Sequence, residues 1–411
     1  MSKLTLRDVP VANRRVLVRV DFNVPLVHDT AAHPGVGDDT RIRATLPTLE
    51  YLIQQKAKLI LCSHLGRPKG KPDPAYSLHP VAERLRMLLD ERLGRGVQVG
   101  FCPRTVGLEA REMANGLAPG HVLLLENLRF QPQEEANDAG FARALAALAE
   151  LYVNDAFGSA HRAHASTVGV TRFLQPAVAG FLMERELRYL GQALGHPQHP
   201  FVVILGGAKV ADKLPVLRSL AHQADVVLIG GGMAYTFLAA QGQPVGESLC
   251  EPDKFPLARE VLEMARGKNQ LRLPADHVVA EKLAPGVPHQ TVSQIPSGQK
   301  ALDIGPQTRE LYAAEIARAK HIVWNGPMGV FEIPPFDQGT LAVARAVAEA
   351  TRKGAVSIAG GGDSVAAIEA AGVASQITHV STGGGASLEF LAGIELPGVA
   401  ALTNAGPGGR R

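Results

Sequence analysis

Short runs of apolar residues alternate along this chain with longer stretches in which apolar residues recur every three or four positions. The short runs are rich in Val, Ile and Leu and lack polar alternation, which is typical of strands covered on both faces. The longer stretches predict amphipathic helices at residues 40–54, 79–93, 136–150, 258–266, 307–319 and 336–350. Strands that alternate with helices form βαβ units, so the pattern predicts an α/β protein with parallel sheets.

The apolar runs end differently in the two halves of the chain. In the first half they stop at charged residues, as in Arg14–Asn23, Lys58–Arg67, His121–Arg129 and Leu151–His164. In the second half they stop at glycine, as in Phe201–Lys209, Val226–Met233, Ala355–Asp363 and His379–Gly385. Open parallel sheets bind ligands just beyond the carboxyl ends of their strands. We therefore expect a small, highly charged anion in the first half, a nucleotide in the second, and transfer of phosphate between them.

A length of 411 residues exceeds one ordinary hydrophobic core and predicts more than one domain. Phe181–Leu194 has apolar residues at helical spacing, with Pro176 before it and Gly195 after it. These boundary signals predict a helix of about four turns between the halves. A helix packed within one lobe is the alternative. We predict two doubly wound, Rossmann-like lobes, at residues 1–175 and 196–389, joined by a hinge helix at 176–195.

Composition narrows the class of protein. Hydrophobic residues make up 46% and charged residues 20%, which is typical of a soluble globular protein. The net charge of +3 argues against a general nucleic-acid-binding surface. Cys62, Cys102 and Cys250 are widely separated, which indicates buried thiols in a reducing compartment. The N-terminus has no signal-like apolar stretch, and no run reaches the ~20 apolar residues of a membrane span. We expect a cytoplasmic protein without membrane partners.

The segment Gly206–Lys213 follows a predicted strand and opens a predicted helix. Glycines let backbone N–H groups approach an anion, and a helix N-terminus favours negative charge. Lys209 and Lys213 are four residues apart, so we expect them on one helical face. Cations there oppose the helix dipole by about 0.3–1 kcal/mol each, a cost that a bound phosphate would offset. The alternative is a pair of solvated lysines. Neither G-x-x-x-x-G-K-[ST] nor G-x-G-x-x-G occurs, which argues against a P-loop and weakens a dinucleotide site.

Two further strand ends in the second half carry acidic residues. Gly360–Ser364 repeats the strand, glycine and helix arrangement with Asp363 in place of a base. Asp363 is predicted to cap the helix, to bind Mg²⁺ beside nucleotide phosphates, or to do both. In Trp324–Glu332, the carboxylate of Glu332 is placed to accept a ribose hydroxyl, a weak signal when taken alone.

Polar residues in the first half recur at or just after predicted strand ends, except Arg41, which begins a helix. They are Arg19, Asp21, Asn23, Arg41, His64, Arg67, Arg129, His161, Arg162 and His164. Guanidinium groups pair bidentately with phosphate and carboxylate, so their recurrence at one structural position favours an anion site over isolated surface charges. His161 and His164 have the spacing of metal ligands but lack a third ligand, so we predict hydrogen bonding and not zinc or iron binding.

With these motifs assembled, the chain resembles the phosphoglycerate kinase family from near its start to about residue 403. The matching segments are RVDFNVP (19–25), SHLGRP (63–68), LLENLRF (124–130), NDAFGSAHRAHAS (154–166), LGGAKVADK (205–213), GGGMA (230–234), WNGPMGVFE (324–332), GGGDS (360–364) and HVSTGGGASLE (379–389). Their order and spacing make chance similarity implausible.

The resemblance implies a monomeric glycolytic kinase that transfers a phosphoryl group reversibly from 1,3-bisphosphoglycerate to Mg-ADP, giving 3-phosphoglycerate and Mg-ATP. The implied substrate residues are Asp21, Phe22, Asn23, Arg41, His64, Leu65, Gly66, Arg67, Arg129 and Arg162. The implied nucleotide residues are Lys209, Lys213, Gly305, Glu332, Gly361, Gly362, Asp363 and Ser364, with Asp363 binding the metal. The catalytic set is Arg41, Lys209 and Gly362. The resemblance also implies that the C-terminal segment, residues 390–411, returns to the first lobe.

The chain departs from the family pattern at three places. Ser364 stands where the family often has Thr, and Met328 replaces a common Pro, which affects the stiffness of its loop. Residues 27–38 form a longer segment than usual and read as a surface loop, while residues 404–411 read as a tail that is disordered at its end.

Two other classes of protein share parts of this pattern. A nicotinamide-dependent dehydrogenase has similar sheets and glycine turns, but the expected fingerprint is missing. A solute-binding protein also closes on an anion, but it needs an export signal and has no use for two nucleotide turns. Phosphoryl transfer from an acyl phosphate needs no strong base, so we expect catalysis by alignment and charge compensation as the lobes close.

Overall fold

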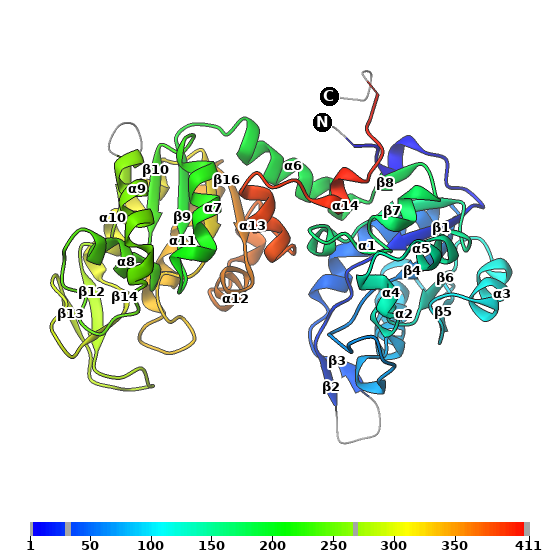
Figure 1. Ribbon diagram of the computed structural model, residues 1–411, viewed down its shortest axis with the longest axis horizontal. Helices are drawn as coiled ribbons and strands as arrows, with labels where there is room; N and C mark the ends of the chain where they lie inside the picture. Colours follow the sequence, from blue (N-terminus) through cyan, green and yellow to red (C-terminus); the bar gives the residue numbers. More distant parts are fainter. Residues whose placement is uncertain (1–2, 29–33, 266–269, 407–411) are drawn as a thin grey trace. The chain divides into compact units, whose positions relative to one another are not determined.

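The computed structural model describes residues 3–28, 34–265 and 270–406 and divides the chain into two compact units. Unit 1 comprises residues 1–187 and 395–411, and unit 2 comprises residues 188–394 (Figure 1). The boundary falls within helix α6 (Phe181–Gly195), at the place where the sequence predicted a connecting helix. The end of the chain belongs to unit 1, where Asn404 forms a β-bridge with Lys3. The predicted disorder of the last residues falls on 407–411, outside the described residues.

Unit 1 is built on a six-stranded parallel sheet. Its strands, in spatial order, are β5 (Val99–Cys102), β6 (Val122–Leu125), β4 (Lys58–Cys62), β1 (Arg15–Arg19), β7 (Leu151–Asn154) and β8 (Ala177–Ala179). Besides the first part of α6, its α-helices are α1 (Thr40–Gln54), α2 (His79–Leu93), α3 (Leu108–Gly116), α4 (Pro132–Glu135), α5 (Ala139–Ala146) and α14 (Pro397–Ala400). Leucines of α1 and α2 pack on Val16 and Val18 of β1, so these two helices cover one face of the sheet. Because the connections reverse direction between β1 and β7, a ligand is expected beyond the carboxyl ends of these strands.

Unit 2 is built on a second six-stranded parallel sheet. Its strands, in spatial order, are β11 (Gln270–Arg272), β10 (Val226–Ile229), β9 (Phe201–Leu205), β15 (His321–Asn325), β16 (Val356–Gly360) and β17 (His379–Val380). Its helices are α7 (Val210–Ala221), α8 (Met233–Ala240), α9 (Phe255–Ala265), α10 (Pro306–Arg318), α11 (Gln338–Arg352), α12 (Gly362–Ala370) and α13 (Gly385–Leu391). This is the Rossmann strand order, with its reversal between β9 and β15. The predicted pair of doubly wound α/β lobes is confirmed.

The structure corrects three sequence predictions about local elements. The predicted helix at 136–150 is shorter, at Ala139–Ala146. The segment 27–38 is not simply a loop, because β2 (Leu26–His28) pairs antiparallel with β3 (Pro34–Val36). Leu26 and Val36 pack against the core of unit 1, which explains why a short hairpin forms there. A small antiparallel sheet of β12 (His277–Ala280), β13 (Gln290–Val292) and β14 (Lys300–Ile304) was not predicted.

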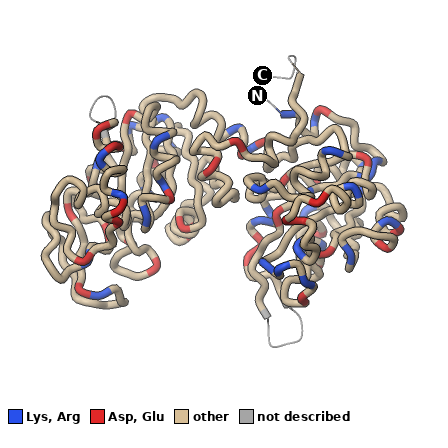
Figure 2. Tube along the Cα trace, in the orientation of Figure 1, with Lys and Arg blue, Asp and Glu red and all other residues tan. Residues whose placement is uncertain are grey.

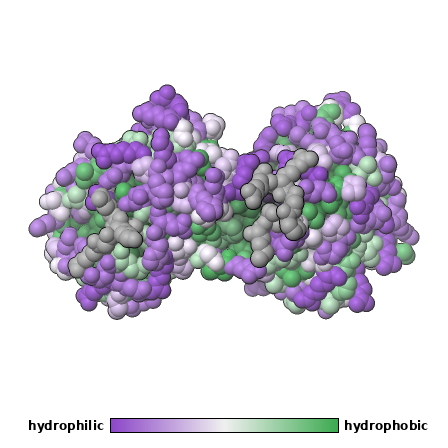
Figure 3. All heavy atoms as spheres, turned by 90° about the horizontal axis from the view of Figure 1, so that it is seen from above, coloured by the Kyte–Doolittle hydropathy of each residue, from purple (hydrophilic) through white to green (hydrophobic). Residues whose placement is uncertain are grey.

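The charged residues of both units are mixed in sign. Basic and acidic residues are interspersed along the backbone trace (Figure 2). The face seen in Figure 3 is largely hydrophilic on each unit, with scattered hydrophobic residues. Among the described residues, every helix is too short or too polar to cross a membrane.

The turns that follow β9, β10 and β15 pack backbone against backbone. Gly326 has φ 96°, and a Cβ atom there would collide with the carbonyl of Gly206. Gly231 donates its N–H to the carbonyl of Met328 at 2.9 Å, and Gly207 donates to Pro327 at 2.9 Å. Met328 itself is fully buried and packs on Gly230. This departure from the family pattern therefore fills the core beneath the turns.

We expect Gly326→Ala to destabilise unit 2 more than Gly354→Ala. Both residues have positive φ, but a Cβ atom at Gly354 meets no atom within 4 Å. The control should lose about 1 kcal/mol through backbone strain alone, and Gly326→Ala about 2 kcal/mol more through the collision. Trp324, the single tryptophan, is buried in unit 2, so its fluorescence during urea unfolding reports on this unit. Equal losses for the two variants would contradict the proposed backbone packing.

Candidate functional site

The predicted anion-binding residues of unit 1 gather at the carboxyl edge of its sheet. Asp21, Phe22 and Asn23 follow β1, and the segment 64–67 follows β4. The side-chain oxygen of Asn23 accepts the N–H of Gly66 at 2.9 Å, and Arg129 donates to the carbonyl of Gly66 at 2.7 Å. Hydrogen bonds therefore join the ends of β1, β4 and the 3₁₀ turn that follows β6 into one surface.

Asp21 and Arg41 form an ion pair at the edge of this surface. Arg41 lies in the first turn of α1, and its Nη1 is 3.0 Å from Oδ1 of Asp21. Burial by itself raises the pKa of the Asp21 carboxyl, but the neighbouring imidazole of His64 and the guanidiniums of Arg41 and Arg19 outweigh burial and leave the pKa lowered. Asp21 is therefore ionised, and it holds the guanidinium of Arg41 at a place where the guanidinium is still partly exposed.

The remaining arginines differ in how firmly they are held. Arg129 is buried, with Nε 3.1 Å from the carboxylate of Glu135. Arg162 donates from Nε to Nε2 of His161 at 3.0 Å. Arg67 is exposed and makes no hydrogen bond or ion pair with any residue that the structure describes, so its guanidinium is available to a ligand. Phe22 and Leu65 have buried side chains, so only their backbones can face a ligand.

The two histidines with metal-like spacing are His161 and His164. Within residues 3–28, 34–265 and 270–406 no group of three or more His, Cys, Asp or Glu side chains is placed to hold a metal. Burial and the charges of Arg19 and Arg129 lower the pKa of His164 to about 4, so its imidazole is neutral. It lies 3.8 Å from the carboxylate of Glu134. The hydrogen bond that His161 accepts from Arg162 agrees with the predicted hydrogen-bonding role, whereas the separation of His164 from Glu134 is too long for a hydrogen bond.

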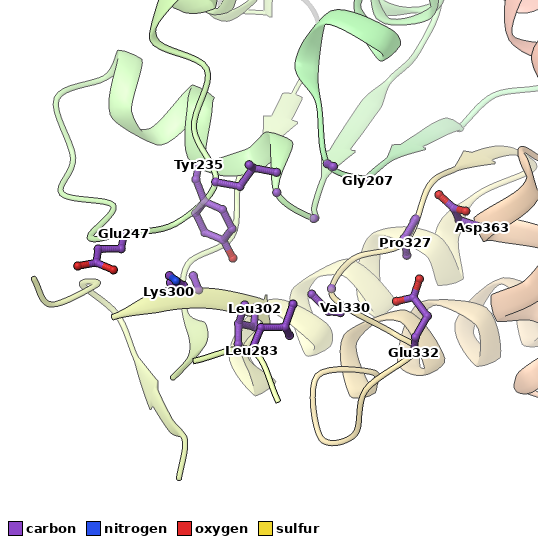
Figure 4. A pocket seen from close by; sticks show the side chains of 16 residues that line it. Gly207, Tyr235, Glu247, Leu283, Lys300, Leu302, Pro327, Val330, Glu332 and Asp363 are labelled. Atoms are coloured by element: carbon purple, nitrogen blue, oxygen red, sulfur yellow. The ribbon is translucent and has the colours of Figure 1, made fainter. Parts of the chain in front are cut away.

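Unit 2 contains a cavity of about 530 Å³ at the switch point of its sheet. Glycine turns after β9 and β10 form one wall, and residues of β14 and of the loop after β15 form the other (Figure 4). Glu332 and Asp363 lie toward one end of the cavity, and Glu247 and Lys300 toward the other (Figure 4). The lining residues are Gly207, Ala208, Gly231, Gly232, Tyr235, Glu247, Leu249, Leu283, Lys300, Ala301, Leu302, Pro327, Gly329, Val330, Glu332 and Asp363. Apolar walls with a few polar groups are typical of small-molecule sites.

The predicted shared helical face of Lys209 and Lys213 is wrong. Helix α7 begins at Val210, so Lys209 is the N-cap residue with an extended backbone. The N–H of Val210 donates to the carboxylate of Glu251 at 2.6 Å, which fixes the start of the helix there. Lys209 is exposed, whereas Lys213 donates to the side-chain oxygen of Asn325. Burial lowers the pKa of Lys213.

Asp363 does not cap helix α12. The N-cap position is Gly361, with φ 93°, and Asp363 is the second residue of the helix. Its exposed carboxylate lines the cavity. Ser364 is buried, and its hydroxyl oxygen accepts the N–H of Gly326 at 2.6 Å. The hydroxyl at this position therefore ties the turn after β15 to the start of α12.

Of the eight predicted nucleotide residues, Glu332 and Asp363 line the cavity, and Lys209, Lys213, Gly305, Gly361, Gly362 and Ser364 do not. The sequence also failed to predict several residues of the cavity walls. Gly305 does not line the cavity; it is the N-cap of α10 and packs on the carboxylate of Asp276. The lining residues that the sequence did not predict include Tyr235, Leu249, Leu283, Lys300, Ala301 and Leu302. Several of these residues belong to β14 or to loops around the small antiparallel sheet, which the sequence did not predict. Only the alternation of apolar residues at 300–304 could have indicated this wall.

A cationic cluster on one Rossmann-like unit and a glycine-rimmed cavity on another are typical of small-molecule kinases. A sequence model of the family "Phosphoglycerate kinase" matches residues 6–394. The chain belongs to the phosphoglycerate kinase family. Phosphoglycerate kinase of Koribacter versatilis is 58% identical over 408 residues, which cover 98% of this chain and 100% of that protein. The same enzyme of Chloroflexus aggregans is 55% identical over 408 residues, with the same coverage of 98% and 100%.

Solved structures of phosphoglycerate kinases are also similar to this chain. The structure of phosphoglycerate kinase from Coxiella burnetii is 39% identical and matches with a TM-score of 0.86 over 97% of this chain and 98% of that chain. The enzyme from Pyrococcus horikoshii OT3 is 34% identical and matches with a TM-score of 0.81 over 97% and 98%. This chain is therefore a glycolytic phosphotransferase that moves phosphate between 1,3-bisphosphoglycerate and ADP.

If the cavity binds the nucleotide, Ala301→Leu should weaken ADP binding by about tenfold or more, because the longer side chain fills space between its walls. Binding of 3-phosphoglycerate should stay unchanged, because Ala301 belongs to unit 2 and the cationic cluster belongs to unit 1. Isothermal titration calorimetry with each ligand measures both affinities. Unchanged ADP affinity would place the nucleotide elsewhere.

Proposed function

We propose that the arginine cluster of unit 1 binds 3-phosphoglycerate or 1,3-bisphosphoglycerate, and that the cavity of unit 2 binds Mg-ADP or Mg-ATP. The observation that carries this proposal is that the two ligand environments differ in kind. One is a cationic surface, and the other is a cavity with apolar walls and glycine turns. Each lies at the switch point of its own sheet, where α/β proteins bind ligands.

In unit 1, the phosphate and carboxylate of the substrate pair with Arg67, Arg129 and Arg162, helped by Asn23 and His64. Guanidinium groups match these planar or trigonal anions with two parallel hydrogen bonds. The pairs Asp21–Arg41 and Arg129–Glu135 hold their guanidiniums in place before the substrate arrives. Less side-chain entropy is then lost on binding.

In unit 2, the base lies between the apolar walls formed by Leu249, Leu283 and Val330, and Glu332 accepts a ribose hydroxyl. Asp363 holds Mg²⁺. Its exposed carboxylate at the cavity fits this role, because Mg²⁺ usually takes one or two carboxylates and completes its shell with phosphate oxygens and water. When bound, the ion neutralises charge on the nucleotide phosphates.

The reaction breaks the bond between phosphorus and the acyl oxygen while a terminal oxygen of ADP bonds to phosphorus. The leaving group is a carboxylate and the attacking oxygen is already anionic, so no general base is required. We assign Arg41, Lys209 and the N–H of Gly362 to the charge on the migrating group, and Lys213 to nucleotide phosphate. The two units must approach each other during turnover, with bending at the ends of α6, so that water is excluded. We further propose that the enzyme works as a cytoplasmic monomer.

Arg41→Ala should lower kcat by on the order of 10³, the effect of other arginines that stabilise phosphoryl-transfer charge. Arg43→Ala is the matched control, because Arg43 lies on the same helix, is exposed and pairs with Asp39. The control should keep kcat within about twofold, since exposed ion pairs contribute little. Steady-state kinetics with 3-phosphoglycerate and Mg-ATP separate the two outcomes. A normal kcat with only a raised KM would show that Arg41 binds the substrate in its ground state and does not stabilise the transition state.

Asp363→Asn should raise the Mg²⁺ concentration needed for half-maximal ADP binding by about tenfold, because an amide is a weaker ligand for this ion than a carboxylate. The control is Asp212→Asn, an exposed carboxylate in the first turn of α7 that does not line the cavity. Calorimetric titrations of ADP at several Mg²⁺ concentrations measure the effect. The same metal dependence in both variants would remove Asp363 from the metal site.

A further inference from the structure

Arg19 is a buried cation beneath the anion surface of unit 1. It is the last residue of β1, only 1% of it is exposed, and it lies under the residues assigned to substrate. Its Nε donates to the hydroxyl of Ser166 at 2.8 Å, and its Nη1 donates to the carbonyl of Val20. Its Nη2 lies 3.1 Å from Nδ1 of His64 and 3.4 Å from the hydroxyl of Ser159. Arg19 therefore touches a proposed substrate residue without reaching the surface itself.

The contact between Arg19 and His64 determines where the imidazole carries its proton. A guanidinium has only donors and stays protonated in proteins. At 3.1 Å from Nη2 of Arg19, Nδ1 of His64 must therefore accept, because two N–H groups facing each other would repel. An imidazole whose Nδ1 accepts is neutral and carries its hydrogen on Nε2.

The buried charge of Arg19 is compensated from its other side. The hydroxyl of Ser166 accepts a hydrogen bond from Arg19 and donates one to the carboxylate of Glu134 at 2.6 Å. Glu134 also accepts the N–H of Ser166 at 3.0 Å and is fully buried. A buried cation without such a partner is strongly disfavoured, so Glu134 and Ser166 keep Arg19 in place against His64.

The charges around His64 favour the same neutral form of the imidazole as its hydrogen bond to Arg19 does. Burial is the main cause that lowers the pKa of His64 well below its usual value, and Arg19, Arg129 and Arg41 lower it further. The negative charge of Asp21 raises the pKa of His64, but Asp21 also forms an ion pair with Arg41. The imidazole is therefore neutral at physiological pH.

We propose that Arg19 is a positioning residue that fixes His64 as the neutral tautomer with its hydrogen on Nε2, so that His64 offers an N–H donor to the anionic substrate. The assignment of the substrate to unit 1 rests on the proposed function. His64 then has no role as a proton acceptor from the substrate, and its contribution to binding is the same at any pH above its lowered pKa. In a tautomer with the hydrogen on Nδ1, the bare Nε2 lone pair would face a phosphate or carboxylate oxygen and repel it.

The first test is made on the substrate-free, wild-type protein and does not depend on catalysis. Two-bond ¹H–¹⁵N NMR spectra of the histidine rings distinguish the two neutral tautomers and the imidazolium. The signals of His64 are assigned by their loss in His64→Gln. At pH 7 we expect Nε2 to carry the hydrogen and Nδ1 to be unprotonated. A hydrogen on Nδ1, or an imidazolium, would overturn the proposal even if the protein is an active kinase.

The second test compares two amide replacements. The amide nitrogen of Gln reaches the position of Nε2, whereas that of Asn reaches only the position of Nδ1. His64→Asn should raise KM for 3-phosphoglycerate by about tenfold or more, the effect of losing one charge-assisted hydrogen bond, and His64→Gln should raise it clearly less, because its amide nitrogen keeps a donor at the position of Nε2. Equal KM values for the two variants, or the reverse order, would contradict donation from Nε2.

The role of Arg19 is tested by a double-mutant cycle. Arg19→Met removes the donor to His64 while keeping much of the buried volume. It should raise KM for 3-phosphoglycerate in the wild-type background, but less in His64→Gln, where no tautomer remains to be fixed. An equal effect in both backgrounds would show that Arg19 acts only on the fold. If Arg19→Met does not fold, as judged by circular dichroism, the NMR spectrum and the two amide variants still decide the question.

Discussion

In each unit, backbone N–H groups or cationic side chains face the carboxyl edge of a buried parallel sheet, and the proposed function depends on an anion binding there. That edge is the carboxyl end of the strands, at the point where the chain connections reverse direction. In unit 1 this point lies between β1 and β7, and in unit 2 between β9 and β15. Much of the structure follows from this constraint, because most residues proposed for binding are brought to one of two places by the strand that precedes them, whereas Arg41 reaches the first place from the start of α1.

The two units meet the constraint with different physical means. Unit 2 brings three turns so close together that glycine is needed, as at Gly326 over Gly206, and the cavity beside them is lined by glycine turns, apolar side chains and a few charged groups. Unit 1 concentrates guanidinium groups instead, and it has to balance their charge before a ligand arrives. Carboxylates do so in two layers: Asp21 pairs with Arg41 near the surface, and Glu134 compensates Arg19 through Ser166 below it. Buried charges are tolerated only when they are paired in this way.

Much of this arrangement could be predicted from the sequence, because strands buried on both faces and amphipathic helices have distinct periodicities. The helices 40–54 and 79–93 have the predicted bounds, and the strand ends carry the predicted residues. What failed depended on tertiary contacts. The start of α7 at Val210 is fixed by Glu251, forty-one residues later, so the sequence pattern alone put Lys209 inside the helix. Gly305 came from the family resemblance as a nucleotide residue; in the structure it begins α10 against Asp276, and its role toward the nucleotide stays a prediction.

Each unit is proposed to bind one substrate at its own strand ends. Hydrogen exchange, measured by mass spectrometry with one ligand added at a time, tests it most directly. 3-Phosphoglycerate alone should slow exchange at residues 21–23, 64–67 and 128–130, and Mg-ADP alone at residues 207–213, 230–235, 326–332 and 361–364. Protection by 3-phosphoglycerate at the glycine turns of unit 2, with none at the ends of β1 and β4, would contradict the account.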